Sequence, residues 1–150
     1  MELAVVELLN FRVYTIVPNV SWGLGLGHEC DLLAMDSNHK FTEIEIKTTK
    51  ADLKRDFEKP HGHRSKYITR LVFAVPEALV ADAAKLIPET AGLICVYWDG
   101  KGAARYKAYW VIKKRHKQAP PPPDRFCLKF MELGCMRIWT LKQKLLKHRS

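Results

Sequence analysis

Long apolar segments are missing from this sequence. The most apolar runs, such as Gly92–Trp98, fall far short of the roughly 20 residues that a membrane-spanning helix needs. Residues 1–10 carry no basic group ahead of their apolar residues, whereas a secretory signal peptide begins with a basic region. Both absences argue against a membrane partner, and they predict a protein that stays in the cytoplasm.

Cysteine is scarce and widely spaced. The four cysteines stand at positions 30, 95, 127 and 135, and no CxxC pair occurs. This spacing predicts reduced, mostly buried thiols rather than a disulfide framework. The close groups His28-Glu29-Cys30 and His61-Gly62-His63 do not have the spacing of a familiar structural zinc site. We therefore do not expect zinc.

Acidic residues are few relative to basic ones. The chain has 16 Asp and Glu against 25 Lys and Arg, which gives a formal net charge of +9. A positive surplus attracts polyanions, so it favours DNA as a partner, with RNA not excluded. The length of 150 residues and the 47% hydrophobic content are enough for one folded domain with a core.

Hydrophobic periodicity and turn residues predict an α/β fold. Consecutive strands early in the chain predict antiparallel pairs, and later strand–helix–strand units predict parallel crossovers. The result is a mixed β-sheet flanked by helices, with a C-terminal hairpin and helix. Pro18-Asn19 should stop the first strand. The expected elements are helix 2–11, strands 12–17, 29–35 and 41–47, helix 50–59, strand 71–75, helix 77–86, strands 93–98 and 104–112, and helix 125–147.

A proline run divides the chain near its end. Pro120–Pro123 predicts an extended, semi-rigid connector. We therefore expect a domain over residues 1–118, and a connector with a C-terminal helix packed on that domain over 119–150. The connector and helix also leave open an interaction role in which the chain forms a homodimer.

The strand expected at 41–47 carries the most informative pattern. Its period-two alternation places Glu43, Glu45 and Lys47 on one face. Thirteen residues separate Asp31 from Glu45, which is room for two adjacent strands joined by a turn. Two carboxylates that converge in this way repel each other unless a divalent cation lies between them, and Mg²⁺ prefers such oxygen ligands. Lys47 can then place its ammonium beside metal-bound water or a developing phosphate charge.

These residues carry a resemblance to a known family. Asp31 followed by Glu45-Ile46-Lys47 on consecutive strands resembles the PD-(D/E)XK nuclease superfamily. Within that superfamily the stretch His28–Val96 is most similar to MmcB-like DNA-repair nucleases and related phage or prophage proteins. The similar segments are ECDLLAM, EIEIKTTKADLKRDFEK, RLVFAVP and AGLICV. Cys30 stands where the family's name has proline, which leaves the carboxylates intact.

The resemblance implies a fold and a reaction. The fold would be a restriction-endonuclease-like core in the order αβββαβ, and the reaction Mg²⁺-dependent hydrolysis of phosphodiester bonds. Asp31 and Glu45 would bind the metal, Lys47 would assist the attacking water, and Glu7 on the first helix matches a further acidic position of the family.

We therefore predict a deoxyribonuclease that uses Mg²⁺ or Mn²⁺, in DNA repair or in the processing of mobile-element DNA. Its metal ligands would be Asp31, Glu45 and the Ile46 carbonyl. Glu29 and Glu43 are candidates for a second metal, although ordinary surface carboxylates fit them too. The predicted nucleic-acid contacts are basic residues on and after the next helix: Lys50, Lys54, Arg55, Lys59, His61, His63, Arg64 and Lys66.

Two other interpretations remain open at this point. A Glu–Lys alternation also occurs on ordinary solvated sheet faces, and basic helices are often merely solvated. The second alternative is a non-catalytic nucleic-acid-binding module of the same fold.

Overall fold

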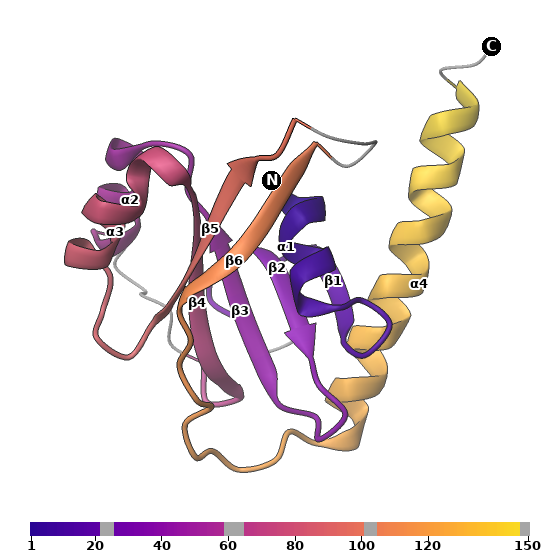
Figure 1. The fold of residues 1–150 in the computed structure, drawn as a ribbon. Coiled ribbons are helices and arrows are strands. Elements are labelled where there is room, and N and C mark those ends of the chain that lie inside the picture. Colours follow the sequence, from indigo (N-terminus) through magenta and orange to yellow (C-terminus); the bar gives the residue numbers. More distant parts are fainter. Residues whose placement is uncertain (22–25, 59–64, 101–104, 148–150) are drawn as a thin grey trace.

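The computed structural model describes residues 1–21, 26–58, 65–100 and 105–147. Its sheet has six strands in the order β1-β2-β3-β4-β5-β6. Helices cover both faces of this sheet (Figure 1). The elements are α1 (Glu2–Leu9), β1 (Thr15–Val20), β2 (Cys30–Met35), β3 (Phe41–Ile46), α2 (Lys50–Phe57), β4 (Ile68–Pro76), the 3-10 helix η1 (Glu77–Leu79), α3 (Val80–Leu86), β5 (Gly92–Trp98), β6 (Tyr106–Ile112) and α4 (Asp124–Lys147).

The connections follow the predicted pattern. β1 with β2, β2 with β3, and β5 with β6 pair antiparallel, whereas β3 with β4 and β4 with β5 pair parallel. The parallel pairs are joined by α2 and by η1 with α3, because a crossover needs a segment long enough to return across the sheet. The predicted α/β fold and the αβββαβ order of its core are confirmed.

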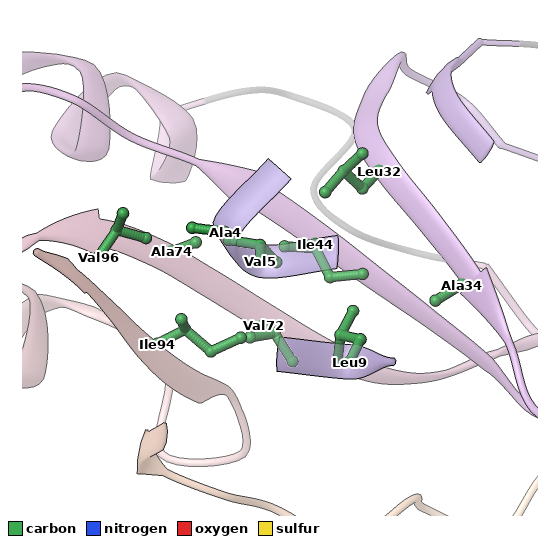
Figure 2. Packing of buried hydrophobic residues seen from close by; sticks show 10 residues of the cluster. All are labelled: Ala4, Val5, Leu9, Leu32, Ala34, Ile44, Val72, Ala74, Ile94 and Val96. Atoms are coloured by element: carbon green, nitrogen blue, oxygen red, sulfur yellow. The ribbon is translucent and has the colours of Figure 1, made fainter. Parts of the chain in front are cut away.

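One face of the sheet packs against α1. Ala4, Val5 and Leu9 of this helix contact alternate, buried residues of the central strands (Figure 2). Ile44 of β3 and Val72 of β4 belong to this cluster. The even-numbered residues of β3 therefore face α1, and its odd-numbered residues face the other way.

The opposite face carries two separate apolar clusters. One lies under α4, where Phe41 and Phe130 make an edge-to-face ring contact at 5.2 Å. The other lies under α2 and α3, and includes Leu53 and Phe73. Glu43 pairs with Leu33 of the first cluster on one side and with Leu71, packed against the second, on the other. A polar strip of β3 thus runs between two apolar regions.

Two local predictions need correction. β1 continues through Pro18 to Val20 instead of stopping at the proline. The reason is that β1 is an edge strand, where a residue without an N–H need not break a ladder. The helix expected at 77–86 begins as the 3-10 helix η1 before α3. Part of the hairpin connection between the strands predicted at 93–98 and 104–112, and the end of the helix predicted at 50–59, lie outside the described residues.

Helix α4 packs on the sheet only through its first half. Cys127 and Phe130 are buried there, and the helix approaches β1 so closely that a Cβ on Gly134 would lie 3.1 Å from Val17 Cγ2. Its second half extends away from the sheet (Figure 1), which leaves Trp139 64% exposed. None of the described helices is long and apolar enough to cross a membrane. All four cysteines are free thiols, and all but Cys135 are buried, as predicted.

Candidate metal centre

Two glutamates of β3 are buried on the polar strip. Glu43 is 0% and Glu45 is 2% exposed, which is rare for carboxylates unless they are paired or bind a cation. Lys47, just beyond the strand, donates a hydrogen bond from Nζ to Glu45 Oε2 at 2.6 Å. The other oxygen, Glu45 Oε1, is buried and has no hydrogen-bond partner among the described residues.

Lys47 is itself held from two sides. Its Nζ lies 2.9 Å from Asp56 Oδ1 as well as 2.6 Å from Glu45. Asp56 is buried on α2, a helix that begins at Thr49, whose hydroxyl accepts the N–H of Asp52 at 3.1 Å. This cap sets the start of the helix, and about two turns after Thr49 the side chain of Asp56 is buried on the same side of the helix as Leu53.

Burial and neighbouring charges shift the pKa values of this pair in the same direction. Burial raises the pKa of Glu45 to about 7, although the Lys47 ammonium lowers it; the negative charges of Asp31 and Glu43 raise it further. Burial lowers the pKa of Lys47, but hydrogen bonds to Glu45 and Asp56 outweigh this and hold it above its ordinary value. Lys47 is therefore charged at neutral pH, while Glu45 is poised to take up or release a proton.

His28 joins the two glutamates. Its Nε2 lies 2.5 Å from Glu43 Oε1. One ligand atom from each of His28, Glu43 and Glu45 lies within 4.8 Å of the others, so the three side chains form a possible metal-binding group. The sequence did not single out His28 as a ligand, because it stands in a segment before β2 without regular structure and no spacing rule links it to β3.

Asp31 lies at the same end of the sheet. Its Oδ2 accepts a hydrogen bond from the Ile46 backbone N–H at 2.6 Å. Continuing the register Leu32↔Ile44 and Leu33↔Glu43 by one pair places Asp31 opposite Glu45, as the spacing predicted. The structure thus brings Asp31 next to β3, yet it is not one of the three residues of the His28 group.

Glu7 is not brought to this site. It is exposed on α1, and α1 covers the face of the sheet that Ile44 occupies. Glu43 and Glu45 lie on the opposite face, so the sheet separates them from the helix. The sequence places Glu7 on the first helix, but it does not show which face of the sheet that helix covers.

The structure describes four of the eight residues that were predicted to contact nucleic acid. Lys50 pairs with Asp82 at 2.8 Å and Arg55 lies 3.8 Å from Asp52. Lys54 is exposed on α2, and Lys66 Nζ lies 4.9 Å from the centre of the Tyr67 ring. The other four, Lys59, His61, His63 and Arg64, lie outside the described residues.

The donor set fits a divalent cation. Carboxylates dominate it, and one imidazole is added, which suits Mg²⁺ or Mn²⁺ at the oxygens and tolerates other divalent metals at the nitrogen. The buried oxygen Glu45 Oε1 lacks a hydrogen bond, and a buried carboxylate oxygen without one is costly. A bound cation would remove that cost and would favour the ionised form of Glu45.

Comparisons with known proteins agree with this picture at the level of family and fold. The chain matches the family model described as DNA repair protein MmcB-like over residues 1–144. No curated protein matches it. Among solved structures it is similar to the SPO1766 protein of unknown function from Silicibacter pomeroyi, with 18% sequence identity and a TM-score of 0.66. That similarity covers 98% of this chain and 89% of the other chain.

Proposed function

Starting from the fact that the chain belongs to the MmcB-like DNA repair protein family, we propose that it is a metal-dependent nuclease that hydrolyses phosphodiester bonds in DNA. The observation that carries this proposal is Glu45, a buried carboxylate with one oxygen hydrogen-bonded to Lys47 and the other without a hydrogen bond from any residue that the structure describes. The family's role in DNA repair and the charge of +9 support DNA as the substrate. The free thiols suit the reducing cytoplasm, where we place the protein.

Glu45 is the residue that both candidate ligand sets share. One set joins it to Asp31 and the Ile46 carbonyl, as the sequence predicted, and the other to His28 and Glu43. When bound, Mg²⁺ or Mn²⁺ would polarise the phosphate and lower the pKa of a bound water. The protein's contribution is to hold the ligands in a buried place where electrostatic interactions are strong.

Lys47 acts through a fixed positive charge. Its ammonium is held between Glu45 and Asp56, so it stays protonated beside the ligands. From there it can donate a hydrogen bond to the attacking water or to a phosphate oxygen as negative charge develops. Asp56 is a positioning residue in this scheme, because it contacts Lys47 and orients it.

The test is cleavage of labelled DNA and RNA substrates, covering duplex, single strand, flap and junction, with Mg²⁺ or Mn²⁺ and with EDTA as the control. We expect metal-dependent cleavage of DNA by the wild type. Calorimetric Mn²⁺ titrations of Asp31→Asn and Glu43→Gln then distinguish the ligand sets, because the variant of a true ligand should lose metal affinity about 10-fold or more. Wild-type protein that binds DNA without cutting any substrate would overturn the proposal.

A non-catalytic nucleic-acid-binding module is the second candidate. One observation favours it: Lys47 Nζ is already bound by two carboxylates, and Asp31 by a backbone N–H. These groups would then only stabilise the end of β3. DNA binding without cleavage, together with no detectable Mn²⁺ binding, is the result expected from such a module.

A further inference from the structure

A second charged surface lies at the other end of the parallel strands. An open hollow of about 690 Å³ is lined by the start of β4 at residues 68–71, by Glu89 and Thr90, and by Lys114, Arg115 and Lys117. A neighbouring hollow of about 550 Å³ is lined only by basic residues: Lys40, Arg70, Lys113, Lys114, Arg115 and His116. Arg70, Lys114 and Arg115 line both, so we treat the two hollows together as the basic groove.

The lysines and arginines of the basic groove have no acidic partner in the described part of the chain, whereas His116 Nε2 lies 3.9 Å from Asp36 Oδ2. Among the described residues, no carboxylate forms an ion pair with Lys40, Arg70, Lys113, Lys114, Arg115 or Lys117. The lining holds a single carboxylate, Glu89. Helix α2 differs, because Lys50 and Arg55 each face an aspartate there.

The groove is built on fixed elements. Arg70 is only 8% exposed, donates from Nε to Thr42 Oγ1 at 3.1 Å and lies 5.5 Å from the Trp110 ring centre. The Lys117 N–H donates to the Thr69 carbonyl at 2.8 Å. This bond holds the segment 113–117 against β4.

One histidine, His116, lines the basic groove. His116 Nδ1 lies 2.6 Å from Thr69 Oγ1, beside the groove. Burial lowers the pKa of His116, and the positive charge of Arg70 lowers it further; Asp36 partly opposes this, and Lys40 adds to it. Burial, more than the neighbouring charges, therefore disfavours the protonated form of His116, whose Nε2 lies 3.9 Å from Asp36 Oδ2.

We propose that the basic groove binds the phosphate backbone of nucleic acid. The proposal rests on the proposed function for the choice of nucleic acid. The five residues 113–117 span at most roughly 16 Å, a length along which one DNA strand presents about five phosphates. The hollows are open, and cations dominate their lining, which suits a repeating anion bound without reading its sequence.

The basic groove and the candidate metal centre lie at opposite ends of β3, and Arg70 hydrogen-bonds Thr42 on the α1 face, whereas Glu45 is on the other face. Lys40 precedes β3 and Glu45 lies near its end, so about 17 Å of strand separates them. That is about half a turn of a DNA duplex.

The test compares two triple variants with the same change of charge. K113Q/K114Q/R115Q removes three cations from the basic groove, and the control K142Q/K144Q/K147Q removes three exposed lysines from the second half of α4. Affinity for a fluorescent 30-base-pair duplex is measured by anisotropy in EDTA over a series of salt concentrations. Circular dichroism melts check that both variants are folded.

We expect the groove variant to lose about 10-fold or more in affinity and about two units of the log–log salt slope, and the control to lose less than about 3-fold. Equal losses in the two variants would show that only net charge matters and would overturn the proposal. So would wild-type affinity in the groove variant, or a groove that binds poly-glutamate as strongly as DNA. The binding assay is done in EDTA, which prevents metal-dependent cleavage, so its result does not depend on nuclease activity. A wild type that never cuts DNA in the cleavage assay would refute the proposed nuclease function, and the binding assay would still show whether the basic groove binds DNA.

Discussion

The two ends of β3 and β4 carry charges of different kinds. At the carboxyl end, Glu43, Glu45 and Lys47 are at most 5% exposed, and Lys47 contacts both Glu45 and Asp56. At the amino end, no lysine or arginine of the basic groove has a carboxylate partner among the described residues, and Glu89 alone among the lining residues is acidic. One sheet thus separates paired, buried charges from cations that, apart from buried Arg70, are accessible.

Because their charges differ in burial, the two ends of the strands are suited to different functions. Buried charges interact strongly, and their pKa values shift, as those of Glu45 and Lys47 do. Such groups suit proton transfer and metal binding. Accessible cations act on a ligand over about 8–10 Å before salt screens them, which suits the capture of a polyanion. Each end can be altered separately.

The largest effect is expected from Glu45→Gln. Loss of this carboxylate removes the ligand that both candidate sets share, so single-turnover cleavage should fall by about 10³-fold or more. DNA affinity in EDTA should stay within about 3-fold of the wild type, because the basic groove is untouched. Glu7→Gln is the matched control, since it makes the same chemical change on the other face of the sheet. An equal loss in Glu7→Gln would place that residue in the site after all.

The next largest effect is on folding stability. Lys47→Met should lower the free energy of unfolding by about 3–5 kcal/mol, because it leaves Glu45 and Asp56 buried without a cation. Urea unfolding in EDTA measures this change. Adding Glu45→Gln to Lys47→Met should restore part of the loss, since one buried charge is removed. A Lys47→Met protein as stable as the wild type would show that the ion pairs do not hold this end of the sheet.

The pH dependence of stability should reveal Glu45. Its pKa is raised from 4.5 to about 7 by burial, so the folded state holds a proton more tightly than the unfolded state. The stabilisation that results is fully present below about pH 4.5 and is lost as the pH rises through about 7. Relative to Glu45→Gln, the metal-free wild type should lose on the order of 2–3 kcal/mol between pH 4.5 and 8. Urea unfolding of both proteins in EDTA over that range is the measurement, and a constant difference between them would contradict the prediction.

The smallest effect is expected at the amino end. The groove variant K113Q/K114Q/R115Q should unfold within about 0.5 kcal/mol of the wild type, because these side chains make no ion pair that folding depends on. Urea unfolding on the preparations used for DNA binding gives the comparison. A loss greater than about 2 kcal/mol would mean that the charges hold segment 113–117 in place, and the two ends would no longer differ in kind.

Much of the fold could be predicted because the signals are local. The alternation of Phe41–Ile46 identified β3 and the face of its glutamates, and the helix predicted from residue 50 is α2. Asp56 was within reach of the same reasoning, since it stands three residues after buried Leu53 and shares its side of the helix. Pro18 misled, because its effect on a strand depends on whether the strand lies at an edge.

What the sequence determined by itself is the order of the elements and the placement of Glu43, Glu45 and Lys47 on one face, because neighbouring residues encode periodicity. Only the tertiary structure decided that this face is buried between two apolar clusters, that His28 meets Glu43, and that Glu7 lies across the sheet. It also decided that Lys40, Arg70 and residues 113–117 gather in one groove. Burial and pairing of charge depend on residues far apart in the chain, which the sheet and the helices packed on it bring together.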